Sequence, residues 1–167
     1  MKITDKIKTA KKVSVTKSRK SFVSGGIIPD FLETEYFYND ICKEIYASVT
    51  FLKNAMGPPN HAHGGAIAAI LDEAMGAAAW IQGLHSLTAK ITIEYLHAVP
   101  VSKPFFVTIT QKEISGRKII QEGILIDADE KHYVRAESIF VLQDTEKLKT
   151  LGPLPEILFS FADQQVK

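Results

Sequence analysis

Residues 57 to 76, GPPNHAHGGAIAAILDEAMG, contain groups that could act together on a carbonyl compound. Gly64 and Gly65 stand where a helix is expected to begin, and the first backbone N–H groups of a helix have no partner inside it. Such N–H groups can stabilise the negative charge that develops on a carbonyl oxygen. Asp72 and Glu73 follow, and no other charged residue lies between them and the two glycines. An anion-binding helix start and a nearby carboxylate predict acyl chemistry.

The segment that carries the two acids is expected to form a buried helix over about residues 65 to 81. Apart from Asp72 and Glu73 it is apolar on every side, which is typical of a helix surrounded by protein. A carboxylate in such a place costs free energy unless it is hydrogen-bonded or paired. The apolar neighbours of Asp72 therefore favour a chemical role for this acid, whereas Glu73 is expected to be solvated or to lie at the helix edge.

Alternation of apolar and polar residues predicts the elements around this helix. The alternation in 43–51 predicts a strand, and the Gly-Pro-Pro-Asn sequence after it predicts a turn in which Asn60 adopts a left-handed conformation. Gly83 is expected to end the helix, and residues 22–34 are expected to form a loop or a short helix. Four further strands are expected in the segments 87–96, 103–114, 117–128 and 132–142.

The order of these elements predicts an α+β fold in which a five-stranded antiparallel sheet wraps around one long buried helix. The expected organisation is a basic N-terminal arm and loop over 1–34, a central domain over 35–145 and a C-terminal tail over 146–167. The apolar residues of 151–161 are expected to dock on the domain or on a partner subunit.

Charge is unevenly distributed along the 167 residues. Residues 1–20 carry eight basic side chains and one acid, whereas the rest of the chain holds twelve basic and eighteen acidic residues, a net charge of −6. The first segment is expected to be a mostly solvated arm, with targeting or contact with a polyanion as alternatives.

The single cysteine, Cys42, excludes an intramolecular disulfide and favours a reducing, cytoplasmic location. We expect no secretory signal and, because of the two acids in the apolar helix, no membrane span.

The segment from residue 40 to about residue 143 resembles the hotdog-fold acyl-CoA thioesterases, in the branch that holds the PaaI-type phenylacetyl-CoA enzymes and the mitochondrial long-chain thioesterases. The shared pattern is a Gly-Pro-Pro turn, the sequence His63-Gly64-Gly65, an acid nine residues after the histidine and a hydroxyl residue sixteen after the acid. The last two are Asp72 and Thr88. The sequences TAKITIEYLHAVP and GRKIIQEGILIDAD are similar to the family's second strand and third hairpin.

The resemblance implies hydrolysis of an acyl-CoA thioester to a free acid and CoA, without cofactor or metal. It implies that the Gly64 N–H polarises the thioester carbonyl, that Asp72 acts as base or nucleophile, and that Thr88 positions the water. His63 belongs to the same catalytic motif. Further contacts with the substrate are expected from Asn60, Gly65, Glu73, Lys90, Arg117 and Lys118.

Two positions depart from the family pattern. Gly57 stands where some members carry an amide side chain that shares the oxyanion, so the expected oxyanion donor is backbone N–H alone. His97 and Ala98 stand where members often have a basic residue and a proline, so the resemblance does not imply the family's CoA contacts at these two positions.

Each motif residue also has a purely structural interpretation. In this interpretation, His63 merely stabilises its turn through a hydrogen bond to a backbone carbonyl. The two glycines merely form the start of the helix, and Thr88 is an ordinary strand residue. The histidines of the chain match no closed set of metal ligands, so no metal site is expected. The absence of a Gly-x-Ser-x-Gly motif, and of any motif around Cys42, argues against a serine or cysteine hydrolase.

Gly64 and Asp72 are eight residues apart, which separates them by about 12 Å along a helix. A carboxylate cannot span this gap to a thioester held at the helix start. If both act on one carbonyl they come from two chains, and a homodimer or dimer of dimers with shared active sites is expected. Neither binding of nucleic acid nor stable insertion into a membrane is expected. A non-catalytic acyl-CoA-binding hotdog protein and a hotdog hydratase or dehydratase remain as alternatives.

Overall fold

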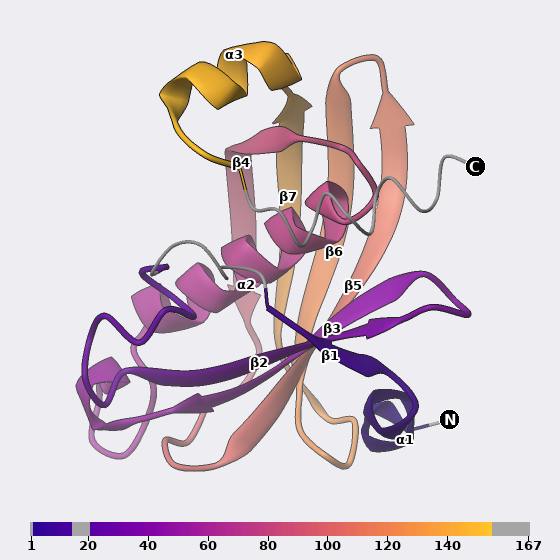
Figure 1. Cartoon of the computed structure of the whole chain (residues 1–167). Helices are drawn as coiled ribbons and strands as arrows, with labels where there is room; N and C mark the ends of the chain where they lie inside the picture. Colours follow the sequence, from indigo (N-terminus) through magenta and orange to yellow (C-terminus); the bar gives the residue numbers. More distant parts are fainter. Residues whose placement is uncertain (1, 15–20, 155–167) are drawn as a thin grey trace.

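The structure is a computed structural model that describes residues 2–14 and 21–154. In this part of the chain a long helix, α2 (Gly64–Trp80), lies against the concave face of a seven-stranded antiparallel sheet (Figure 1). The short helices α1 (Ile3–Lys8) and α3 (Thr145–Leu151) lie near the two ends of the described chain. In the order of the sheet, the strands are β1 (Lys11–Val13), β2 (Leu32–Asn39), β3 (Glu44–Phe51), β5 (Pro104–Ser115), β6 (Lys118–Ile126), β7 (His132–Leu142) and β4 (Ser86–Tyr95).

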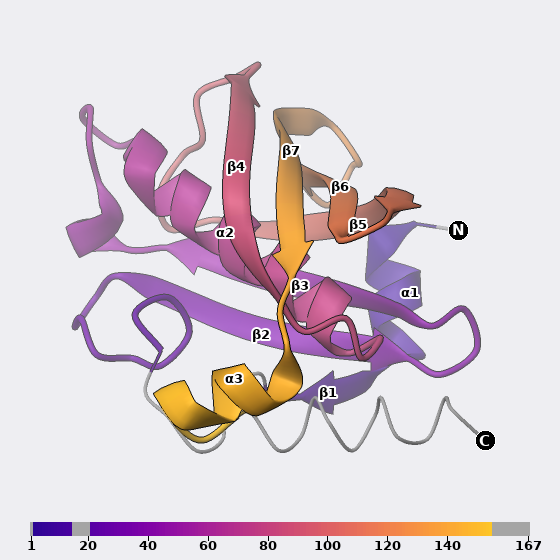
Figure 2. The same ribbon diagram turned by 90° about the horizontal axis from the view of Figure 1, so that it is seen from above.

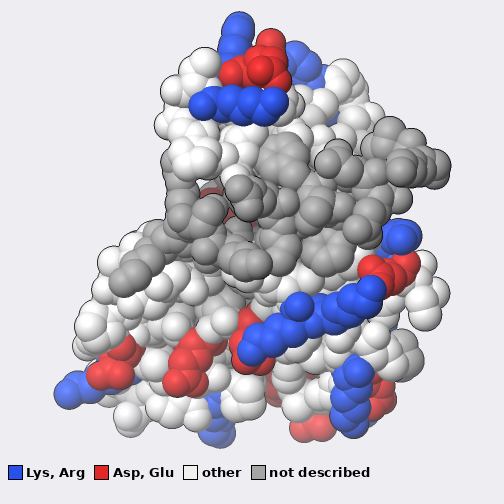
Figure 3. Space-filling model, viewed as in Figure 1, with Lys and Arg blue, Asp and Glu red and all other residues white. Residues whose placement is uncertain are grey.

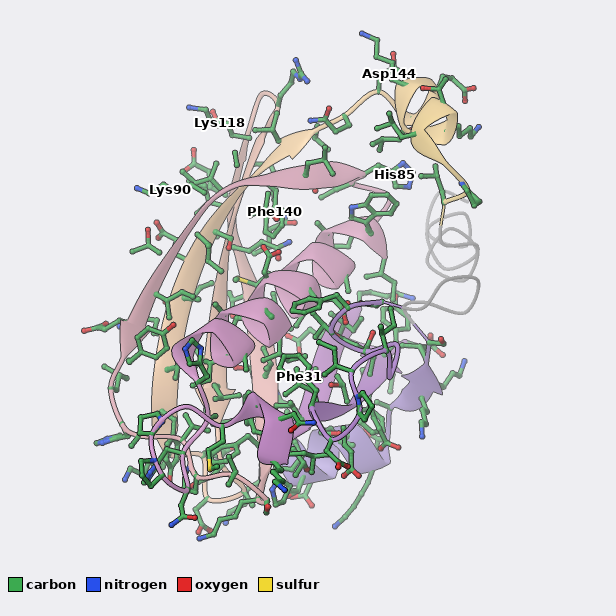
Figure 4. The ribbon with its side chains drawn as sticks, turned by 90° about the vertical axis from the view of Figure 1, so that its left-hand side faces the viewer. Phe31, His85, Lys90, Lys118, Phe140 and Asp144 are labelled. Carbon is green, nitrogen blue, oxygen red and sulfur yellow. The ribbon has the colours of Figure 1, made fainter. Side chains whose placement is uncertain are left out.

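The core lies between α2 and the concave face of the sheet, which curves around the helix (Figure 2). From β7, Phe140 points toward the helix (Figure 4) and is almost fully buried. Burial of one such large apolar side chain stabilises the fold by about 1.5–3 kcal/mol. The expectation of a curved sheet around one apolar helix is therefore confirmed. The side chains of α2 with no exposed surface are those of Ile70, Leu71, Ala74, Met75 and Ala79.

The predicted number of strands was wrong, because the described sheet has seven strands and not five. The five expected strands correspond to β3 to β7, and the sequence analysis missed β1 and β2. β2 pairs with β3 along its whole length and buries Tyr36 and Tyr38 against the core. Its other face carries Glu33 and Glu35 as well as Phe37, which packs on a second, smaller cluster, so the hydrophobic alternation of the strand is short.

The basic N-terminal segment also contains regular structure. Ile3 of α1 is buried with Tyr46 and Ile126, and Val13 of β1 joins the main core. Lys6, Lys11 and Lys12 lie outside, beside acids of β2, β3 and the turn between them, and Figure 3 shows basic and acidic side chains next to each other over this part of the surface. The segment is therefore more than the solvated arm that its composition predicted. The ion pairs with these acids are Lys6–Glu44, Lys11–Asp40 and Lys12–Glu35.

The predicted turns around the site are confirmed. Asn60 has a φ of 60° and Gly83 a φ of 78°, and both values lie in the left-handed region. Gly116 has a φ of 58° in the hairpin between β5 and β6. The predicted docking segment, 151–161, lies for the most part outside the described residues. Within the described part of the chain, no helix combines the length and the apolarity that crossing a membrane requires.

The distance between α2 and the sheet is set at Gly123 of β6. A Cβ atom on this glycine would lie 3.1 Å from Cγ and Sδ of Met75 and 3.4 Å from Cδ2 of Leu71. At Gly76, on the helix itself, a Cβ atom would lie 3.7 Å from the Phe140 ring, which is an ordinary contact. The two glycines therefore differ, because only Gly123 is required by a close approach.

Gly123→Ala is expected to lower the free energy of unfolding by about 1–3 kcal/mol, because the added methyl group overpacks the contact with Met75. Gly76→Ala is the matched control and is expected to raise it by up to about 1 kcal/mol, because alanine favours a helix over glycine. Urea denaturation of both variants measures the difference. A Gly123→Ala protein as stable as wild type would show that α2 does not depend on this close approach.

Candidate active site

Asp72 and Thr88 meet between α2 and β4. The Thr88 hydroxyl donates a hydrogen bond to Oδ1 of Asp72 at 2.8 Å. The β4–β7 pairing shifts its register between Thr88 and Lys90, so a bulge follows the threonine directly. Asp72 is half-buried, and its second oxygen accepts no hydrogen bond from any described residue. This arrangement holds a carboxylate in one orientation and leaves one of its oxygens free for chemistry.

The start of α2 is built around His63, whose ring caps the helix. Its Nδ1 accepts the Gly65 N–H at 2.9 Å, and its backbone carbonyl accepts the N–H groups of Ala66 and Ile67. No described residue accepts the Gly64 N–H. The cap therefore satisfies the neighbouring donors and leaves one backbone N–H for an incoming group.

The capping role of His63 also explains why residue 57 is glycine. A Cβ atom on Gly57 would lie 3.0 Å from the backbone Cα of His63 and 3.1 Å from its ring. His63 is held there by the hydrogen bond from its own N–H to the Ala55 carbonyl, at 2.7 Å. A side chain at position 57 would be tightly packed against this histidine, so His63 or the turn would have to shift by a few tenths of an ångström to admit an amide here.

Tyr95, at the end of β4, is a residue of this region that the sequence analysis did not single out. Its hydroxyl donates to the Gly64 carbonyl at 2.9 Å. The alternation of Ile91, Ile93 and Tyr95 places this tyrosine on the strand face that turns toward the helix, and that signal was available in the sequence. What the sequence does not show is that the end of β4 reaches the first turn of α2.

A cavity of about 390 Å³ opens beside the helix start. Gly64 and Tyr95 both line it, and most of its other walls are apolar. Asp72 does not line this cavity, which agrees with the separation of the two groups along α2. The remaining lining residues are Pro58, His61, Ala62, Ile67, Leu96, His97, Ala98 and Val99.

Glu73 points toward β2, away from Thr88. Its carboxylate accepts the Tyr36 hydroxyl at 2.7 Å and also the hydroxyl of Ser21. Burial, and then the charge of Glu73 and its hydrogen bond, raise the pKa of Tyr36 well above the usual value, so the phenol remains a donor at neutral pH. Glu73 was expected to be solvated or to lie at the helix edge, and the structure shows it partly buried, with a hydrogen bond to each of its two oxygens. Its substrate contact remains a prediction.

The basic residues that were expected to contact the substrate lie elsewhere. Figure 4 shows Lys90 and Lys118 on the outer side of the sheet, away from α2. Arg117 donates from Nε and Nη2 to the Leu142 carbonyl, at 3.2 and 2.9 Å. Asn60 is exposed in its turn. Within one chain the structure does not bring these four side chains to Asp72, and their substrate contacts remain predictions.

Metal ligands do not gather in the part of the chain that the structure describes, where no three His, Cys, Asp or Glu side chains lie close enough to hold an ion. Cys42 is exposed, with its Sγ 3.4 Å from a carboxylate oxygen of Glu44.

Comparisons with known proteins show which family the chain is similar to. Residues 59–131 match the family model described as Thioesterase superfamily. The acyl-coenzyme A thioesterase THEM4 of Mus musculus is 32% identical over 116 residues, which are 69% of this chain and 50% of the relative. The chain therefore spans about half the length of this curated relative.

Solved structures show the same fold. A crystallised thioesterase superfamily protein superposes with a TM-score of 0.61 and 30% identity, over 65% of this chain and 53% of the other. The PaaI protein of Escherichia coli, from the phenylacetic acid degradation operon, superposes with a TM-score of 0.57 and 15% identity, over 60% of this chain and 73% of the other. Together with the family match, these comparisons confirm the resemblance: the chain has the hotdog fold, and its residues 59–131 match the thioesterase superfamily.

Proposed function

We propose that the protein is an acyl-CoA thioesterase, which converts an acyl-CoA and water to a free carboxylic acid and CoA. The observation that carries the proposal is the Asp72 carboxylate, held by Thr88 at 2.8 Å, on the same helix as the uncapped Gly64 N–H. The name of the mouse relative, an acyl-coenzyme A thioesterase, supports the substrate class.

The chemistry follows from these two groups. The thioester oxygen accepts a hydrogen bond from the Gly64 N–H, which stabilises the negative charge of the tetrahedral intermediate. Asp72 takes a proton from water as the water attacks the carbonyl carbon, or attacks that carbon itself and is then released by water. The C–S bond breaks, CoA leaves as a thiolate and takes up a proton, and the acyl group leaves as the acid. Thr88 fixes Asp72 and positions the water.

The site is proposed to be shared between two chains. The separation of about 12 Å between Gly64 and Asp72 along α2 is too large for both to reach one carbonyl carbon. β4 is an edge strand of the described sheet, and its residues Leu87 and Tyr95 are each about half exposed. An unpaired edge can pair with the same edge of a second copy, which would bring Asp72 of one chain toward Gly64 of the other in a homodimer or a dimer of dimers.

Asp72→Asn is expected to lower kcat by at least about a hundredfold, because an amide keeps the acceptor for Thr88 but cannot take a proton. Binding of acyl-CoA should survive. Release of the CoA thiol from a panel of acyl-CoA substrates measures turnover, and calorimetry measures binding. Glu73→Gln is the comparison with the neighbouring acid. If Asp72→Asn stays active and Glu73→Gln does not, the proposal has named the wrong carboxylate.

Thr88→Ala is expected to lower kcat roughly tenfold, the effect of losing one positioned hydrogen bond, with little change in KM. Thr88→Ser is the matched control, since it keeps the hydroxyl and should retain most of the turnover. Steady-state kinetics on one acyl-CoA separate the two parameters. Equal losses in the alanine and serine variants would contradict the role of the hydroxyl.

The shared site predicts complementation between two inactive variants, Asp72→Ala and Gly64→Pro. Proline removes the Gly64 N–H and is tolerated in the first position of a helix. Each variant alone carries its lesion in both sites, whereas a mixed dimer has one site with both lesions and one intact site. About half of randomly reassembled dimers are mixed, so activity should return to about a quarter of wild type.

The complementation experiment unfolds and refolds the two variants together and assays hydrolysis of acyl-CoA. Native mass spectrometry confirms the mixed dimers, and circular dichroism confirms that each variant folds. If mixed dimers form from folded chains and activity does not return, Gly64 and Asp72 do not act on one substrate from two chains.

A further inference from the structure

We propose that Tyr95 is a positioning residue of the oxyanion site, and that its hydrogen bond to the Gly64 carbonyl fixes the direction of the Gly64 N–H. This inference rests on the proposed thioesterase function. It adds to that function a residue from β4 that acts through the backbone of α2.

The Gly64–Gly65 peptide group is held at both of its polar atoms. Its carbonyl oxygen accepts the Tyr95 hydroxyl at 2.9 Å, and its N–H donates to Nδ1 of His63 at 2.9 Å. Because a peptide group is planar, two hydrogen bonds on opposite edges fix the orientation of the whole plane. Hydrogen bonds in such a chain also polarise and strengthen one another.

The preceding peptide group, which carries the Gly64 N–H, is held on its other side. Its carbonyl belongs to His63 and accepts the N–H groups of Ala66 and Ile67, at 2.9 and 3.2 Å. The two planes that meet at the Gly64 Cα atom are therefore both fixed. The N–H between them has no acceptor among the described residues and keeps one direction.

Such external support matters because the helix begins with two glycines. Glycine has the largest conformational freedom of all residues and loses the most entropy when it is ordered. A first turn of this composition would not hold an N–H in one direction on its own. An oxyanion donor is effective when its direction is set before the charge develops, and Tyr95 supplies that order.

Tyr95 and Gly64 are also sterically matched. A Cβ atom on Gly64 would lie 3.1 Å from the Tyr95 hydroxyl oxygen and 3.3 Å from Cζ. Any side chain at position 64 must push the hydroxyl away from the Gly64 carbonyl. The two residues are therefore packed as one unit, and a lesion in either disturbs the same hydrogen bond.

Tyr95 also lines the cavity beside the helix start, so a direct contact with substrate is the competing explanation. The two explanations differ in their kinetics. A residue that only orients the oxyanion donor changes kcat, because the hydrogen bond to oxygen strengthens in the transition state. A residue that holds the bound substrate changes KM.

The test compares Tyr95→Phe, Gly64→Ala and the double variant in steady-state hydrolysis of one acyl-CoA. Tyr95→Phe is expected to lower kcat about tenfold with KM changed less than about twofold. The double variant should be no slower than the slower single variant, since residues in one unit have non-additive effects. Tyr46→Phe is the matched control: it removes a phenol hydroxyl that donates to Glu44 and should leave kcat unchanged.

Hydrogen exchange gives a second readout that does not depend on turnover. Loss of the Tyr95 hydroxyl should accelerate exchange of the Gly65 amide about tenfold or more, because the peptide plane then loses one of the two hydrogen bonds that hold it. Tyr46→Phe should leave this amide unchanged. An effect of Tyr95→Phe on thermal stability alone would not reproduce this pattern.

The outcomes separate this inference from the function on which it rests. A wild-type protein that hydrolyses no acyl-CoA overturns both. An active wild type with unchanged kcat in Tyr95→Phe overturns only the role of Tyr95. A raised KM at unchanged kcat shows a substrate contact instead, and losses that add in the double variant show that Tyr95 and Gly64 do not act together.

Discussion

The packing of one apolar helix inside a curved sheet is the constraint on which the other features depend. α2 approaches β6 so closely at Gly123 that a methyl group would overpack Met75. This contact fixes the helix relative to the strands. Side chains of β4 then form hydrogen bonds with polar groups of the helix. Thr88 donates a hydrogen bond to Asp72 in the middle of α2, and Tyr95 donates one to the Gly64 carbonyl at the start of α2. The site is a set of helix atoms held by strand side chains.

The same packing gives two adjacent acids different surroundings. Successive residues of a helix point about 100° apart, so Asp72 faces β4 while Glu73 faces β2. Asp72 keeps one oxygen without a hydrogen-bond donor among the described residues, whereas both oxygens of Glu73 accept hydroxyl groups, from Tyr36 and Ser21. A carboxylate with a free oxygen can take a proton from water. A carboxylate that joins a strand to a loop mainly stabilises the fold.

The sequence predicted the parts of the fold that local patterns determine. The helix was expected over 65 to 81 and spans Gly64–Trp80, and the strands β3 to β7 follow the alternation of their residues. β2 was missed because its outward residues are charged, and its burial depends on pairing with β3. The Asp72–Thr88 contact could be expected from the family spacing. The Tyr95–Gly64 contact could not, because it depends on how far the curved sheet carries β4 along the helix.

The ion pairs of the N-terminal segment alter the electrostatic field around its lysines. Along the sequence this segment is strongly cationic, but in the structure Lys11 and Lys12 lie beside Asp40 and Glu35 of the adjacent chain segment. Such exposed pairs contribute little to stability and weaken as salt rises. Lys11, Lys12 and their two acids are balanced in charge, so a distant anion meets paired opposite charges at this place on the surface and not two free cations.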